Sequence, residues 1–169
     1  MRYLTVVRHA QAAPGPDDFS RRLTVAGRGQ CHQLRASAND PVGLGRFGPA
    51  VALVSAAVRS CETFRESFEE TPLCVGFETS ELIYNGRREV TGSDALFELS
   101  TFDPVTQSLI FVAHFPTVRD LVELISDVNV NDLIPKEYPL AGAFVFELPD
   151  DETIGHRRYR FVDSFVPTL

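Results

Sequence analysis

The amino-acid sequence predicts an α/β fold, a three-layer sandwich in which helices cover both faces of a mostly parallel sheet with an antiparallel edge. Three observations support this. Short apolar runs rich in β-branched and aromatic residues alternate along the chain with segments of helical periodicity. The last two apolar runs look like a closing antiparallel pair. No linker, internal repeat or low-complexity stretch divides the 169 residues, so we expect one domain over residues 1–169.

The first half of the chain gives two strands and two helices. Tyr3–Val7 is a β-branched and aromatic run that ends at a charged residue, which is typical of a buried strand. Thr24 is a suitable helix N-cap, and apolar or small residues follow it at helical spacing. A glycine-rich break then leads to a second buried strand at Ala50–Ser55, and residues 60–69 read as a helix.

The middle of the chain is less regular. Leu73–Phe77 is a weak third strand, residues 78–91 read as a polar loop, and Ser93–Leu99 as a short helix.

The last part has the strongest periodic signals. Ser108–Ala113 is a strongly apolar strand, and the residues after Pro116 recur with the helical period. Ala143–Leu148 and Arg158–Val162 are the expected antiparallel pair.

Composition narrows the class of protein. Hydrophobic residues at 44% and charged residues at 23% are average for a globular protein, which argues against disorder. The net charge of −7 argues against nucleic acid or anionic membrane as partners. Cys31, Cys61 and Cys74 are scattered, and the apolar stretch at the N-terminus is too short for a signal peptide. We therefore expect a cytoplasmic protein.

Polar side chains follow three of the predicted strands. The first ends in Arg8 and His9, the second leads to Arg59, and Ser108–Ala113 runs directly into His114. Since ligands of open α/β sheets bind at the carboxyl ends of strands, these four residues could converge on one crevice. Arginine binds phosphate bidentately, and neutral imidazole is a competent nucleophile or acid–base group, so the set indicates a phosphoryl site.

Other interpretations remain for the histidines. A single histidine at a strand end is commonly a structural group, and we treat His32 and His156 that way. His9 and His114 could be metal ligands, but no carboxylate or cysteine falls at metal-ligand spacing near either, and the arginines would repel a cation. We therefore expect no metal and no cofactor.

Four ordered segments resemble the histidine phosphatase superfamily, which also contains the phosphoglycerate mutases. RHAQA at 8–12 resembles its R-H-G signature, and DFSRRLTVAG at 18–27 its D-x-x-R-x-L-T-x-x-G segment. VSAAVRSCET at 54–63 and VAHFPTV at 112–118 are similar to its V-S-P-x-x-R-x-x-x-T and G-H-x-P-x-V segments. The small size and truncated middle look most like the bacterial phosphohistidine phosphatase branch.

The resemblance implies a phosphoglycerate mutase-like fold and a metal-independent phosphatase. His9 would attack phosphorus and form a phosphohistidine, while Arg8, Arg59 and His114 hold the phosphoryl oxygens. Arg21 matches a family arginine near the pocket mouth and would help to bind substrate. Arg8, Arg21 and Arg59 meet no obvious carboxylate in the sequence, so we expect a positive local potential despite the acidic chain.

Two small residues depart from the family pattern. Ala10 replaces the signature glycine, where a methyl group could crowd the pocket; we expect tuning of activity. Ala56 replaces the proline of V-S-P, at little expected cost.

The proton donor is the larger departure. Glu81 and Glu89 are candidates, each also readable as a solvated loop charge, and Tyr84 and Asn85 occupy the position where the family's acid is expected. General acid catalysis is worth about 10²–10⁴-fold, and an alkoxide leaving group needs it more than an imidazole does. A weak acid therefore favours phosphohistidine over a sugar phosphate as substrate, and disfavours mutase activity.

Short loops suggest an open, shallow pocket suited to a phosphohistidine on another protein. A broad-specificity phosphomonoesterase for small molecules and a catalytically weak phosphate-binding module are the alternatives. The oligomeric state is not predicted.

Overall fold

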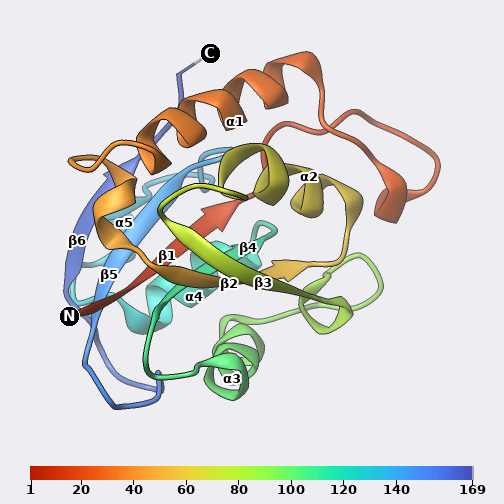
Figure 1. The fold of residues 1–169 in the computed structure, drawn as a ribbon. Coiled ribbons are helices and arrows are strands. Elements are labelled where there is room, and N and C mark those ends of the chain that lie inside the picture. Colours follow the sequence, from red (N-terminus) through yellow and green to blue (C-terminus); the bar gives the residue numbers. More distant parts are fainter. Residues whose placement is uncertain (169) are drawn as a thin grey trace.

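The computed structural model describes residues 1–168 and shows three layers, with one six-stranded sheet between two sets of helices (Figure 1). The strand order is β3-β2-β4-β1-β5-β6. Pairs among the first four of these strands are parallel, and β5 pairs antiparallel with both β1 and β6. The predicted fold class is therefore confirmed. The strands are β1 (Arg2–Arg8), β2 (Ala50–Ser55), β3 (Cys74–Ser80), β4 (Ser108–Ala113), β5 (Ala143–Leu148) and β6 (Phe161–Phe165).

The helices divide between the two faces of the sheet (Figure 1). On one face, α1 (Val25–Ala38) packs against α2 (Val58–Ser67). On the other, α3 (Gly92–Phe102) packs against α4 (Thr117–Ile125), with the short α5 (Val130–Leu133) beside it. Each face has its own apolar core, because alternate residues of the buried strands point to opposite sides. The central strands are thus packed between two apolar cores.

Local sequence explains the segment that joins β1 to α1. Thr24 caps α1 as predicted, since its hydroxyl accepts the N–H of Gly27 at 2.9 Å. A Cβ at Gly27 would lie 2.2 Å from the carbonyl oxygen of Gln11, so only glycine allows α1 to approach the chain after β1 this closely. The cap and the close approach together fix the segment that follows His9.

The last strand lies three residues later than predicted, at Phe161–Phe165 in place of Arg158–Val162. The reason is Tyr159, which is buried and forms an isolated parallel bridge with Ser126 at the end of α4. Its N–H donates to the carbonyl of Ile125 at 2.6 Å. This stretch is bound to α4, so the sheet pairing begins only after it.

Two further boundaries differ. The helix predicted at residues 60–69 spans Val58–Ser67, and it ends before Glu70, whose φ is 62°. The predicted loop at 78–91 begins later, because β3 continues to Ser80 along β2. β3 is an edge strand that exposes most of its residues, so it tolerates polar side chains. Those polar residues made the end of the strand look like a loop in the sequence.

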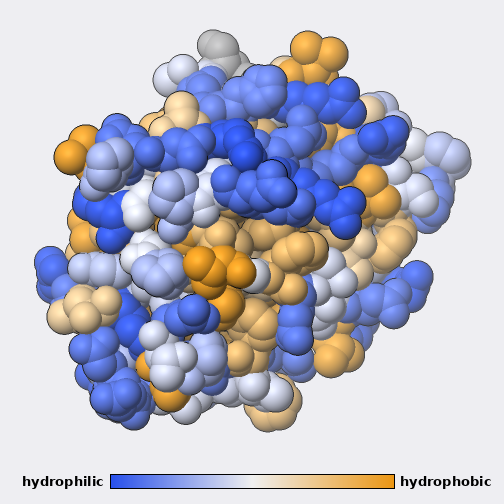
Figure 2. Space-filling view, in the orientation of Figure 1, coloured by the Kyte–Doolittle hydropathy of each residue, from blue (hydrophilic) through white to orange (hydrophobic). Residues whose placement is uncertain are grey.

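The surface over β3 is partly apolar. Val75 and Phe77 are exposed there, and Figure 2 shows apolar surface across the middle of the face on which β3 lies. Within residues 1–168, no helix has both the length and the apolar character that crossing a membrane requires.

Candidate active site

The three strands that carry the predicted site residues are neighbours at the centre of the sheet. β2, β4 and β1 are parallel and adjacent, so their carboxyl ends meet at one edge. His9 follows β1 and His114 follows β4, and the N–H of His9 donates to the carbonyl of Ala113 at 3.0 Å. The two imidazole rings lie 5.3 Å apart between centroids, close enough to contact one phosphoryl group. The structure therefore brings both histidines together.

His9 is a buried, neutral imidazole with one nitrogen free to react. Only 8% of it is exposed, and its Nδ1 lies 2.7 Å from the carbonyl oxygen of Ala10. A carbonyl only accepts, so Nδ1 carries the hydrogen and Nε2 keeps its lone pair. Burial, the largest cause, and the charges of nearby arginines together lower the pKa of His9 to about 4, against the opposing effect of the Ala10 carbonyl. The ring is consequently unprotonated at neutral pH.

His114 is more deeply buried. It is 2% exposed, and burial, together with His9 and Arg59, lowers its pKa to about 2. Its Nε2 lies 2.7 Å from the hydroxyl of Ser55, whereas its Nδ1 is buried and has no hydrogen-bond partner among residues 1–168. One nitrogen of this ring is therefore held by the protein, and the other has no partner among residues 1–168.

Arg8 and Arg59 are each held at the ends of their guanidinium groups. Arg8 Nη1 donates to the carbonyl of Tyr138 at 2.7 Å and to the carboxylate of Glu137 at 3.2 Å. Arg59 Nη1 donates to the backbone carbonyl of Asp18 at 2.8 Å. The Nε atoms of both arginines are buried and, in the described part of the chain, lack an acceptor. Each of these arginines thus has one buried N–H group without a partner in residues 1–168.

Comparison with solved structures identifies the fold. A SixA protein from Agrobacterium tumefaciens described as a phosphohistidine phosphatase superimposes with a TM-score of 0.75 at 24% identity, over 98% of this chain and 99% of that one. A protein histidine phosphatase SixA complexed with tungstate gives 0.71 at 20% identity, over 98% and 97%. A phosphoserine phosphatase from Entamoeba histolytica gives 0.65 at 10% identity, over 100% and 98%.

The chain has the histidine phosphatase fold. No family model matches the sequence, and no curated protein matches it either. The likeness is one of fold, so the chemistry depends on the residues of this chain.

The expectation that no carboxylate meets the arginines is wrong. Asp18 Oδ2 accepts from Arg59 Nη2 at 3.1 Å, and Asp18 Oδ1 accepts from Arg21 Nη1 at 3.0 Å. The hydroxyl of Tyr84 donates to Asp18 Oδ2 at 2.6 Å. This bond and the two arginines hold the pKa of Asp18 at about 2, against the opposing effect of burial. A carboxylate thus partly neutralises the arginines that the histidine phosphatase fold brings together.

A sequence signal for Asp18 existed, because it stands three residues before Arg21 in the D-x-x-R segment. In the 3₁₀ turn Asp18–Ser20 that spacing brings the two side chains together. Arg21 Nε also donates to the carbonyl of Ala13 at 2.8 Å, so the arginine is fixed at the edge of the site.

Neither glutamate candidate for the proton donor lies with the histidines. The side chain of Glu81 is 65% exposed and pairs with Arg87 at 3.4 Å, and Glu89 is exposed. Tyr84 is the group from this segment that reaches the site, with its ring 5.7 Å edge-on from that of His114. Burial and the carboxylate of Asp18 raise the pKa of Tyr84.

The two alanines that depart from the family pattern fit their surroundings. Ala10 is fully buried in the core beneath α1. Four non-glycine residues of the described chain have a positive φ, and Ala10 is not one of them. The N–H of Ala56 donates to the carbonyl of Ser80 at 3.0 Å, a bond that proline could not make.

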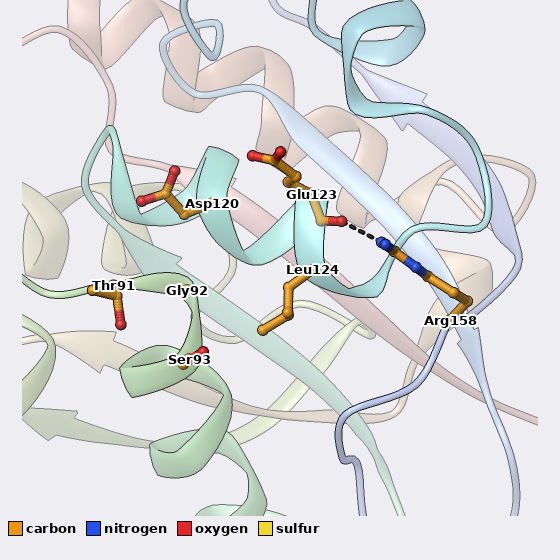
Figure 3. Close-up of a pocket in the computed structure, with 7 residues that line it drawn as sticks. All are labelled: Thr91, Gly92, Ser93, Asp120, Glu123, Leu124 and Arg158. Atoms are coloured by element: carbon orange, nitrogen blue, oxygen red, sulfur yellow. Dashed lines mark hydrogen bonds between the residues drawn. The ribbon is translucent and has the colours of Figure 1, made fainter.

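No other cluster in the described residues offers comparable chemistry. Residues 1–168 contain no group of three or more His, Cys, Asp or Glu side chains placed to hold a metal ion. A surface hollow of about 370 Å³ lies between α3 and α4 (Figure 3), but none of its lining residues belongs to the histidine site. It is lined by Thr91, Gly92, Ser93, Asp120, Glu123, Leu124 and Arg158, and Arg158 is held there by the carbonyl of Glu123.

Proposed function

We propose that the chain is a metal-independent phosphatase that works through a phosphohistidine intermediate on His9. The observation that carries this is the set of three buried nitrogens beside a neutral imidazole: the Nε atoms of Arg8 and Arg59 and Nδ1 of His114, none of which has a partner in residues 1–168. Buried polar groups are nearly always hydrogen-bonded, so these three indicate a ligand with several acceptor oxygens. A phosphoryl group is such a ligand, and guanidinium groups suit its charge.

The chemistry follows from the tautomer of His9. The lone pair on His9 Nε2 attacks phosphorus in line, the N–P bond forms, and the bond from phosphorus to the leaving group breaks. Arg8, Arg59 and His114 stabilise the charge on the phosphoryl oxygens. Water then attacks phosphorus, the N–P bond breaks and inorganic phosphate leaves. Arg21 extends the positive charge toward the substrate.

The substrate we favour is phosphohistidine on a protein. Asp18 has a pKa of about 2 and so holds no proton at neutral pH, and Glu81 points to solvent in its ion pair with Arg87. The site therefore supplies little general acid. An imidazole leaving group is easily protonated by solvent, whereas an alkoxide is a poor leaving group without an acid.

His9 is only 8% exposed, which favours a phosphoryl group presented at the end of an extended side chain. A phosphorylated histidine meets that requirement. Two of the similar structures are named as phosphohistidine or protein histidine phosphatases, and one of these holds tungstate, a phosphate analogue.

A small-molecule phosphomonoesterase is the second candidate, supported by the fold shared with the Entamoeba phosphoserine phosphatase. A catalytically weak phosphate-binding module is the third. The acidic composition and the free cysteines support a cytoplasmic protein whose partners are phosphorylated proteins or small phosphorylated molecules, with neither nucleic acid nor membrane among them.

Hydrolysis of an aryl phosphate in the presence of EDTA tests the reaction class. We expect activity that survives EDTA, is lost in His9→Ala, and is unchanged in His32→Ala, whose histidine is exposed on α1. Alkaline quenching after reaction with labelled phosphohistidine protein should trap label on His9. A His9→Ala protein with full activity would refute the assignment. A native protein with no phosphatase activity would support the third candidate, the phosphate-binding module.

Competition decides the substrate. Phosphohistidine protein, phosphoserine peptide and small phosphomonoesters are offered together, with His9→Ala as the blank. Preference for phosphohistidine supports the favoured substrate, and preference for a small monoester supports the second candidate.

A further inference from the structure

The hydroxyl of Ser55, the last residue of β2, lies 2.7 Å from Nε2 of His114. Ser55 is completely buried and His114 almost so. The hydroxyl of Ser60 is also near Nε2, at 3.5 Å, the limit of a hydrogen bond. Ser55 is therefore the main partner of this nitrogen, and the direction of the bond decides where the ring carries its hydrogen.

The surroundings of Ser55 favour one direction, in which the serine hydroxyl is the donor. Its oxygen has one other contact in the described chain, the N–H of Ala57 at 3.4 Å, which is a donor. If Nε2–H donated to Ser55, the hydroxyl hydrogen would be buried with no acceptor, at a real energetic cost. If the hydroxyl donates to Nε2, the hydroxyl is satisfied, and the hydrogen without an acceptor is the one on Nδ1, where a phosphoryl oxygen would accept it. The neutral ring of His114 then carries its hydrogen on Nδ1.

The same hydrogen position serves opposite purposes in the two histidines. His9 gives its Nδ1–H to the Ala10 carbonyl and turns a lone pair, on Nε2, to the substrate. His114 receives a hydrogen bond at Nε2 and leaves an N–H, on Nδ1, without a partner in residues 1–168. An N–H attracts a phosphoryl oxygen, whereas a bare ring nitrogen repels it.

We infer that Ser55 is a positioning residue that holds His114 in the Nδ1–H tautomer, and so makes it a hydrogen-bond donor to the phosphoryl group beside His9. The inference rests on the proposed function for its catalytic consequence. The tautomer itself is a property of the free protein and is measured without substrate.

Three variants separate this role from packing. Ser55→Ala removes the donor, and Ser55→Thr keeps a hydroxyl. Ser108→Ala is the matched control, because Ser108 is also a buried strand serine and accepts the N–H of Tyr3 at 3.0 Å. It starts β4, six residues before His114, which places it about 20 Å away along the strand.

Long-range ¹H–¹⁵N correlation spectra of the histidine rings report the tautomer at pH 7.5. We expect Nδ1–H on His114 in the native protein, in Ser108→Ala and in Ser55→Thr. In Ser55→Ala we expect a shift toward Nε2–H, the form that free neutral histidine favours. A native His114 that carries its hydrogen on Nε2 would overturn the inference, as would a Ser55→Ala spectrum identical to the native one.

Kinetics and inorganic phosphate binding complete the test. Loss of one oxyanion donor typically lowers kcat by about 10²–10³-fold. Ser55→Ala should shift only part of the His114 population out of the Nδ1–H tautomer, so we expect its kcat/KM to fall by roughly 10–100-fold. Ser108→Ala should show no such fall. Phosphate should also bind Ser55→Ala more weakly, and equal binding would overturn the inference. An inactive native protein that still binds phosphate through an Nδ1–H tautomer would instead refute the proposed phosphatase function alone.

Discussion

Replacing Asp18 with asparagine should tighten the binding of phosphate. The carboxylate lies between Arg59 and Arg21 and accepts the hydroxyl of Tyr84. Asparagine has the same shape, and its oxygen can still accept from one of these arginines, while the backbone carbonyl of residue 18 keeps its bond to Arg59. The substitution therefore removes negative charge from the site and leaves the arginines in place.

The size of the effect follows from the pKa of Asp18. Its fall from 3.8 to about 2 corresponds to roughly 2.4 kcal/mol in favour of the ionised form. The side chain is 45% exposed, so solvent screening reduces the useful part to about 1 kcal/mol. Released from this competition, the arginines should bind phosphate about 5-fold more tightly.

Stability should change in the opposite direction. A pKa lowered by folding adds stability above pH 3.8 that is lost as the pH falls toward 2. Asp18→Asn should therefore unfold about 1 kcal/mol more easily at pH 7, because Arg59 is buried and loses a counter-charge. Saturating phosphate should restore part of the loss.

Titration calorimetry with inorganic phosphate or tungstate at fixed ionic strength measures the affinity, and urea unfolding measures the stability. Glu137→Gln is the matched control, since Glu137 pairs with Arg8 at 3.2 Å but is 64% exposed. We expect less than about a twofold change there. Equal or weaker phosphate binding by Asp18→Asn would mean that the carboxylate serves to align Arg59, and the electrostatic reasoning would be refuted.

Two more predictions concern the fold around the site. Because folding lowers the pKa values of His9 and His114, the unfolded chain binds two more protons than the folded chain below pH 6.5. The free energy of unfolding should therefore fall by up to about 2.7 kcal/mol per pH unit between pH 6.5 and 4. Above pH 6.5 the two histidines should cause no loss of stability. Urea unfolding across this range tests it: His9→Asn should halve the slope, and flat stability would contradict the assigned burial. Gly27→Ala should cost about 1–3 kcal/mol and lower kcat, because a Cβ 2.2 Å from the Gln11 carbonyl must displace the segment after His9. Thermal unfolding and kinetics check this; Gly29→Ala, where the added Cβ has open space, is the control, and equal behaviour of the two variants would count against it.

The fold was predictable because its signals are local and strong. Ala50–Ser55 and Ser108–Ala113 are buried on both faces, so each reads as a continuous apolar run with sharp ends. The errors fall where tertiary contacts override local pattern. β3 is an exposed edge strand with polar residues, and the stretch around Tyr159 is bound to α4. No periodicity in the sequence reports either contact.

The convergence of His9, His114 and Arg59 was predictable, since carboxyl ends of neighbouring parallel strands must meet. The partners of these groups were not. Asp18 reaches Arg59 across 41 residues of chain, and the role of Ser55 depends on a hydroxyl lying 2.7 Å from one particular ring nitrogen. Spacing places residues at a site, but charge balance and tautomers depend on distances that only the folded chain defines.

The energetics of the buried donors explain why such a site points to an anion. A buried polar group without a partner costs about 1–3 kcal/mol, so Arg8 Nε, Arg59 Nε and His114 Nδ1 together weigh heavily against a typical domain stability of about 5–15 kcal/mol. The two apolar cores on either side of the sheet offset that cost in the free protein. Under the proposed function a bound phosphoryl group would remove that cost, because its oxygens would accept from all three nitrogens. In the proposed function, the same burial that keeps His9 neutral would therefore also give the site its affinity for phosphate.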